Sequence, residues 1–143
     1  MTATVSHTLS LTASTNFVGV AVDELRFGRR VLYVAGSFDV ARGAVDDIAD
    51  ALPGDSVARV TRAAGRGRID MVNRGCAVFY TVGQNGGRGV HVDTLILDGV
   101  DVADEPLMAS ALFSLNAAER ALIVASHADI TGLRERLWPT TTR

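Results

Sequence analysis

The carboxylate best placed to do chemistry in this sequence is Asp98, which follows the apolar residues 95–97. A short apolar run that ends in an acid is typical of a buried strand in a parallel sheet, with the acid at the carboxyl end of the strand. Open α/β sheets bind ligands at that edge. Asp98 could therefore hold a magnesium ion weakly. The alternative, which the sequence favours, is a structural acid that accepts hydrogen bonds from the following turn.

Arginines are concentrated in residues 59–88. This segment contains six arginines and one acid, Asp70, and arginine supplies all 14 basic residues of the chain. The asymmetry predicts a surface for a protein partner or for the phosphates of DNA. A solvated, charged sheet edge is the alternative, because strand alternation sends neighbouring side chains to opposite faces and stacking aromatics are few. The arginines predicted to bind a partner are Arg62, Arg66, Arg68, Arg74 and Arg88.

Arg88 lies in the glycine-rich loop predicted at residues 84–88. A guanidinium in such a loop could bind a phosphate, or a carboxylate of a partner. It could equally form an ion pair within the chain, with Asp93 or Asp98.

Other residues with reactive side chains show no pattern that predicts a site. His7, His91 and His127 are widely separated and lack the spacing of zinc ligands. Cys76 is the single cysteine, so an intrachain disulfide is excluded, and a small buried apolar role is predicted for it. No serine lies in the glycine-x-serine-x-glycine context of serine hydrolases.

The composition predicts one globular domain. Of 143 residues 48% are hydrophobic and 21% are charged, and the net charge is −2, which creates no overall attraction to nucleic acid or to an acidic membrane. No apolar run approaches 18 residues, and the first residues do not resemble a signal peptide. We therefore expect no membrane contact and a cytoplasmic location, which would be the host cytoplasm if a phage encodes the chain.

Strands and helices alternate along most of the predicted chain. Apolar runs and period-two alternation predict strands at residues 7–13, 31–35, 56–62, 69–73, 76–82, 94–97 and 120–125. Helical spacing predicts helices at residues 17–25, 38–52, 107–115 and 130–137. Loops are predicted at residues 63–68, which include Arg66 and Arg68, and at residues 126–129.

This order predicts a single three-layer α/β domain. Two β-α-β-α units flank a β-hairpin insert, so a mostly parallel sheet should carry helices on both faces. No internal repeat or linker divides residues 1–143, and residues 139–143 are expected to form a frayed tail.

The segment from Ile69 to Asp98 contains several short motifs in a specific order and spacing. A hairpin with Ile69, Asn73, Gly75 and Phe79 precedes a loop with Gly87, Arg88 and Gly89, then Asp93, then the strand LILD that ends at Asp98. This series resembles the ATPase core of phage terminase large subunits, which are RecA-like, P-loop NTPase-like motors. The strand ALIVAS at residues 121–126 resembles the next strand of these motors. The resemblance implies a RecA-like sheet and a phage or prophage protein.

Two departures from that family concern the groups that handle nucleotides. A Walker A loop uses glycine-rich backbone, a lysine on the phosphates and a serine or threonine on Mg²⁺. The corresponding residues 12–17, TASTNF, have no glycine, and the chain has no lysine. Gly99 follows Asp98 where the family has a catalytic glutamate.

These departures predict a protein that is not an enzyme and that needs no cofactor. The expected function is that of a binding module, in which a terminase-like scaffold contacts a protein, such as a host protein, or DNA. The alternative is a divergent nucleotide- or metal-dependent enzyme that uses Asp98, Asp101 and Arg88. Self-association through the last helix, around Trp138, is a third prediction.

Overall fold

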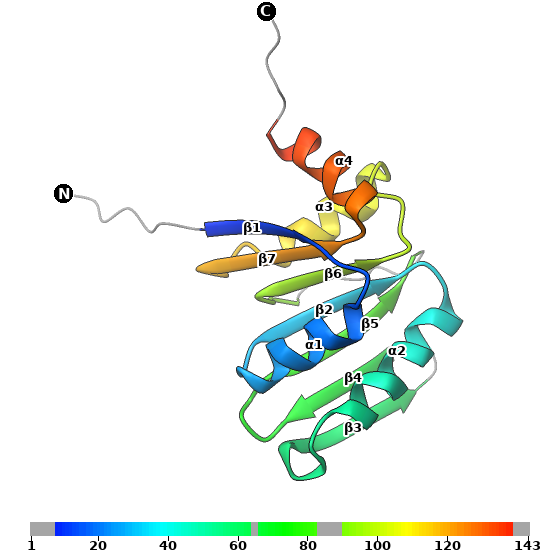
Figure 1. The fold of residues 1–143 in the computed structure, drawn as a ribbon, viewed down its shortest axis with the longest axis vertical. Coiled ribbons are helices and arrows are strands. Elements are labelled where there is room, and N and C mark those ends of the chain that lie inside the picture. The colour runs from blue at the N-terminus through cyan, green and yellow to red at the C-terminus, as the bar shows by residue number, and fades with distance from the viewer. Residues whose placement is uncertain (1–7, 64–65, 83–89, 139–143) are drawn as a thin grey trace, which may run out of the picture.

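A computed structural model describes residues 8–63, 66–82 and 90–138 (Figure 1). Its strands are β1 (Thr8–Ala13), β2 (Arg30–Ala35), β3 (Val57–Ala63), β4 (Arg66–Met71), β5 (Cys76–Thr81), β6 (Thr94–Asp98) and β7 (Arg120–Ala125). Its helices are α1 (Phe17–Arg26), α2 (Phe38–Ala51), α3 (Glu105–Phe113) and α4 (His127–Leu137), with a short 3-10 turn at Gly54–Ser56. The predicted order of elements is confirmed.

The strands form one seven-stranded sheet in the order β1-β7-β6-β2-β5-β4-β3. The neighbours from β1 to β5 run parallel, whereas β4 is antiparallel to β5 and β3 is antiparallel to β4. The hairpin insert therefore extends one side of a parallel sheet, and the predicted α/β class with a mostly parallel RecA-like sheet is confirmed.

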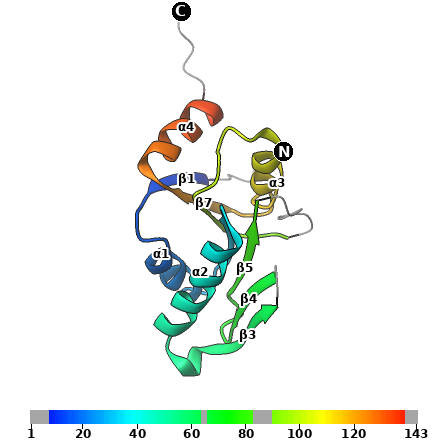
Figure 2. The same cartoon turned by 90° about the vertical axis from the view of Figure 1, so that its right-hand side faces the viewer.

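Helices cover both faces of the sheet. The helices α1 and α2 lie over β2, β5 and β4, whereas α3 and α4 lie at the other end of the sheet, near β1, β7 and β6 (Figures 1 and 2). Because side chains alternate along a strand, each face of the sheet has its own apolar cluster. Tyr33 and Phe79 pack with α1 and α2 on one face, while Leu32 and Leu95 pack with α3 and α4 on the other. Two apolar layers thus enclose the parallel strands.

A polar side chain caps each long helix at its first turn. Asn16, Ser37, Asp104 and Ser126 each accept a hydrogen bond from a backbone N–H three residues later. The cap at Ser126 starts α4 at His127, so the loop predicted at residues 126–129 is wrong.

The loop predicted at residues 63–68 is also wrong. Instead β3 extends to Ala63 and β4 starts at Arg66, so Arg66 and Arg68 belong to a strand. Glycine suits this strand because Gly67 lies against α2: a Cβ atom added there would be 2.6 Å from Val45 Cγ2.

Some predicted features lie outside the described residues. They are His7, the glycine-rich loop with Arg88, and the tail at residues 139–143. In the described part of the chain, the helices are too short or too polar to span a bilayer.

Two glycine substitutions should have opposite effects on stability. Gly67→Ala should lower the free energy of unfolding by roughly 1–3 kcal/mol, because the added methyl group overlaps Val45. Gly43→Ala, inside α2 with no atom within 4 Å of the added Cβ, should raise it by about 0.5–1 kcal/mol. Urea unfolding measures both values. A stabilising Gly67→Ala would contradict the close contact between β4 and α2.

Candidate functional site

Asp98 ends β6 at the carboxyl edge of the sheet, as predicted. Its Oδ2 accepts a hydrogen bond of 2.6 Å from the hydroxyl of Tyr33, on the neighbouring strand β2. The Tyr33 ring is buried and lies 5.4 Å from the ring of Phe79, which fixes the direction of its hydroxyl. One oxygen of the candidate carboxylate is therefore engaged by the core, and its partner is a tyrosine rather than the following turn.

The surroundings of Tyr33 keep its hydroxyl protonated. Burial, foremost, raises the pKa of Tyr33 far above its usual value of 10, and the hydrogen bond to Asp98 and the charges of Asp98 and Asp47 raise it further. The hydroxyl can therefore act as a donor to Asp98 throughout the physiological pH range.

The backbone closes the sheet edge beside Asp98. Because α2 and α3 lie on opposite faces, the carboxyl ends of β2 and β6 form a switch point, which is where open sheets bind ligands. Here the N–H of Gly36 donates to the carbonyl oxygen of Asp98 over 2.8 Å. A Cβ atom on Gly36 would lie 2.4 Å from the carbonyl oxygen of Gly99, whose φ is +75°. Main-chain atoms thus occupy the space between these two strand ends.

The connection from β1 to α1 consists of residues 14–16. Asn16 donates its backbone N–H to Ser14 Oγ, and its own Oδ1 accepts the N–H of Gly19 over 2.9 Å. A Cβ atom on Gly19 would be 2.3 Å from Asn16 Nδ2, so the asparagine side chain lies directly against the first turn of α1. Side chains of the turn itself therefore occupy the amino end of this helix.

Two acids that follow β6, Asp101 and Asp104, accept hydrogen bonds from the local backbone. Asp101 Oδ1 accepts the N–H of Ala103 over 2.9 Å, and Asp104 Oδ1 accepts the N–H of Leu107 at the start of α3. Across residues 8–63, 66–82 and 90–138, no three carboxylate, imidazole or thiol groups gather as a metal site would require. Neither Asp98 nor Asp101 is part of a cluster of ligands there.

Two of the predicted arginines lie on opposite faces of the sheet. Arg62 Nε lies 2.8 Å from Asp46 Oδ1 of α2, whereas Arg68 Nε lies 2.9 Å from Asp70 Oδ1 on its own strand. Strand alternation explains the separation, because Arg62 is opposite Gly67 and Arg68 is opposite Thr61. Each guanidinium has an acidic partner within the chain.

The other predicted arginines do not complete one surface. Arg74 is exposed in the turn between β4 and β5, where its φ is +77°. Arg66 is opposite Ala63 at the end of the β3–β4 pair where the chain passes from β3 to β4, and Arg88 lies outside the described residues. The binding role of these five arginines stays a prediction.

A row of alternating charges crosses the sheet face that Arg68 shares. The register aligns Arg59 of β3 with Asp70 of β4, Cys76 of β5 and Arg30 of β2, and Asp93 precedes β6 beside Arg30. Burial raises the pKa of the half-buried Cys76 thiol, although the neighbouring Arg68 opposes this shift. In the sequence, only the spacing of two residues between Arg68 and Asp70 indicates charges on one face of a strand. The alignment of Asp70 with charged residues on other strands depends on the strand register.

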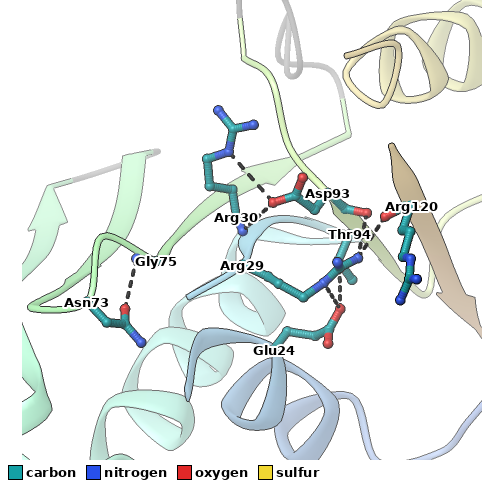
Figure 3. A network of polar contacts seen from close by, with 8 residues as sticks. All are labelled: Glu24, Arg29, Arg30, Asn73, Gly75, Asp93, Thr94 and Arg120. Carbon is teal, nitrogen blue, oxygen red and sulfur yellow. Dashed lines mark hydrogen bonds and ion pairs between the residues drawn. The ribbon is translucent and has the colours of Figure 1, made fainter. Parts of the chain in front are cut away.

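A polar network that includes Arg30 and Asp93 lies at the amino-terminal edge of the parallel strands, opposite the edge that holds Asp98 (Figure 3). Arg29 donates through Nε to Glu24 Oε1 over 2.9 Å and through Nη2 to the carbonyl oxygen of Arg120 over 2.9 Å. The fully buried Thr94 donates its hydroxyl to the same oxygen of Glu24. These contacts join α1 to the starts of β6 and β7.

Motif residues extend this network. Asp93 Oδ2 accepts the backbone N–H of Arg30 over 3.0 Å. Asn73 Nδ2 donates to the carbonyl oxygen of Leu25 at the end of α1. Asn73 Oδ1 accepts the N–H of Gly75, as Figure 3 shows. Asn73, Gly75 and Asp93 therefore position strands and a helix, far along the strands from the edge that holds Asp98.

Comparison with solved structures identifies a similar fold in phage large terminases. The chain aligns with the large terminase of bacteriophage HK97 with a TM-score of 0.62, 13% identity and 84% of this chain covered. It aligns with the large terminase of a thermophilic bacteriophage with a TM-score of 0.56, 12% identity and 85% covered. For the ATPase domain of the Thermus phage P74-26 large terminase the TM-score is 0.50, with 14% identity and 87% covered. The resemblance to a terminase-like, RecA-like core is confirmed at the level of the fold.

The chain spans only part of these proteins. It corresponds to 29% of the HK97 protein, 34% of the large terminase from the thermophilic bacteriophage and 60% of the P74-26 ATPase domain. Neither a family model nor a curated protein matches its sequence.

Because Tyr33 is buried and donates to Asp98, the free energy of unfolding should fall as the pH becomes alkaline. Tyrosine ionises near pH 10 in the unfolded chain, whereas folding raises the pKa of Tyr33, so the unfolded state loses this proton first. The contribution of Tyr33 is therefore complete below about pH 10 and declines as the pH rises above it, by at most about 1.4 kcal/mol per pH unit.

Urea unfolding between pH 8 and pH 11 measures this decline. Tyr33→Phe should lower the free energy of unfolding by about 1–3 kcal/mol at pH 7 and remove the Tyr33 share of the alkaline decline. Tyr80→Phe, a control that leaves Tyr33 and Asp98 in place, should retain the decline. Equal slopes in the two variants would contradict a protonated Tyr33 donor.

Proposed function

We propose that this chain is a non-catalytic binding module that uses the scaffold of a phage terminase-like ATPase. The main support is the β1–α1 connection, which lies where the sequence resemblance to terminase ATPases implies a phosphate-binding loop. Its three residues place the Asn16 side chain against the first turn of α1, where the free N–H groups of a helix would otherwise attract an anion.

The residues around this turn do not fit a nucleotide and its magnesium ion. Phosphate loops surround the phosphates with glycine-rich backbone and supply a lysine. Here the N–H of Gly19 already bonds to Asn16, the N–H of Ser14 bonds to the carbonyl oxygen of Ala125, and the chain has no lysine. Arginine is a poor substitute because its guanidinium is a broad planar fork rather than a compact charge.

The groups beyond β6 also favour binding over catalysis. Phosphoryl transfer depends on positioned charges around the phosphates and the attacking water. Gly99 follows Asp98, whose Oδ2 bonds to Tyr33, and Asp101 bonds to the backbone of its own turn. A nucleotide- or metal-dependent enzyme using Asp98, Asp101 and Arg88 is the alternative.

A protein is the partner that the local charges favour. Arg62 and Arg68 are each paired with an acid of this chain, so they are less available to phosphates. The row formed by Arg59, Asp70 and Arg30 alternates in sign, which suits a protein surface carrying both charges better than a uniformly negative duplex.

Nucleotide binding tests the main proposal. Isothermal titration of ATP with Mg²⁺ into the full chain should produce no more heat than titration into buffer. Micromolar affinity would overturn the non-catalytic proposal. A further loss of that affinity in Asp98→Asn, but not in Asp55→Asn on the distant 3-10 turn, would then establish the alternative site.

Binding of duplex DNA tests the choice of partner. Fluorescence anisotropy at low salt should show no binding, because the chain is negatively charged overall and its strand arginines are paired. Binding would identify DNA as a partner instead if Arg68→Ala lowered the salt slope by about one per lost phosphate contact. Arg134→Ala, on the exposed face of α4, serves as the matched control for total charge.

A further inference from the structure

The two edges of the sheet are built differently. At one edge, β3 carries Arg59 and Arg62, and its register with β4 is irregular between Val57 and Arg59. Charges and bulges of this kind prevent an edge strand from pairing with another chain. At the other edge, β1 has the sequence TLSLTA, without charge, proline or irregular register (Figure 1). Of the two edge strands, only β3 therefore carries features that prevent pairing with another chain.

The backbone of β1 presents hydrogen-bonding groups outward. The N–H of Thr8 donates to the carbonyl oxygen of Glu119, and the N–H of Ser14 donates to that of Ala125. The backbone N–H and C=O groups of the even-numbered residues therefore face β7. Alternation turns the N–H and C=O groups of Leu9, Leu11 and Ala13 toward the open edge. Among the residues that the structure describes, β1 pairs with β7 alone. The outward N–H and C=O groups of β1 could therefore form hydrogen bonds with one additional strand.

The sequence of β1 indicates which strand would fit. Residues 8–12, TLSLT, read the same in both directions. Two copies paired antiparallel about Ser10 would place Leu9 opposite Leu11 of the second copy, and Thr8 opposite Thr12. Leucine would face leucine, which keeps apolar side chains together on one face, and threonine would face threonine, a pair that stabilises antiparallel strands. The two leucines are also the residues whose backbone groups point outward, as a hydrogen-bonded pair requires.

We propose that β1 is a self-association surface, on which β1 of a second copy of this chain pairs antiparallel across a two-fold axis. This pairing joins two seven-stranded sheets into one continuous sheet. An adjoining apolar groove of about 290 Å³, which includes Leu9 and Leu137 in its lining, lies on the face to which Leu9 and Leu11 point. The leucines of the second copy extend this apolar face, and the proposal is independent of nucleotide or partner binding.

A charge placed at the two-fold axis tests the surface. Ser10 is exposed, so Ser10→Lys should leave the fold intact while setting two like charges opposite each other. Sedimentation velocity over a range of concentrations should show a dimer for the wild-type chain and at least about a tenfold weaker association for Ser10→Lys. Thr131→Lys adds the same charge to exposed α4 and should associate like the wild type.

Cross-linking tests the register. Antiparallel residues that are not hydrogen-bonded have Cα atoms about 4.5 Å apart, within the range of a disulfide. In a Cys76→Ser background, Ser10→Cys should form a covalent dimer under mild oxidation, whereas Ala58→Cys on exposed β3 should not. Circular dichroism of each variant confirms folding before association is compared.

Three results would overturn the proposal. The first is a wild-type chain that stays monomeric at its highest soluble concentration. The second is a dimer that Ser10→Lys does not weaken, and the third is a Ser10→Cys chain that cross-links no better than Ala58→Cys. A dimer that Trp138→Ser weakens and Ser10→Lys does not would place self-association at the end of α4 instead.

Discussion

The guanidinium of Arg29 ties together the end of the sheet where β2, β6 and β7 start. It bonds to Glu24 of α1 and to the carbonyl oxygen of Arg120, while Glu24 also accepts the hydroxyl of buried Thr94. The two charged groups are only partly exposed to water, so removing one would leave the other without its partner in a partly desolvated position. The cluster holds the starts of β6 and β7 against α1. From there the backbone ladders run in register to the opposite strand ends, where Asp98 lies beside Ala35.

Periodicity predicted most of the fold because the central strands are unambiguous. Runs such as RVLYVA and RALIVA are apolar on both faces, and only a sheet covered by helices on both sides can bury them. The prediction failed at residues 63–68, where glycines and arginines are typical of loops. A strand forms there because residues 66–71 pair with both β3 and β5, and Gly67 leaves room for Val45 of α2. These contacts join residues that are distant in the sequence.

The candidate site was harder to predict because its decisive partners come from register. Asp98 was found from its place at a strand end, but its partner Tyr33 is 65 residues away. Alternation indicated that the arginines would divide between two faces, but their pairing with Asp46 and Asp70 needed the helix and strand positions. The motif residues Asn73 and Asp93 were found by resemblance, and their structural role is visible only in the network around α1 and β6.

The pairing of β1 with β7 also constrains how the chain folds. Thr8 is aligned with Arg120, so the two strands lie side by side although nearly the whole described chain separates them. Contacts between such distant segments slow folding, because a large loop must close before they form. A ribosome releases residues 8–13 well before residues 120–125, so β1 waits for its only described neighbour. During that interval the backbone N–H and C=O groups of residues 8–13 lack the strand that they pair with in the folded chain.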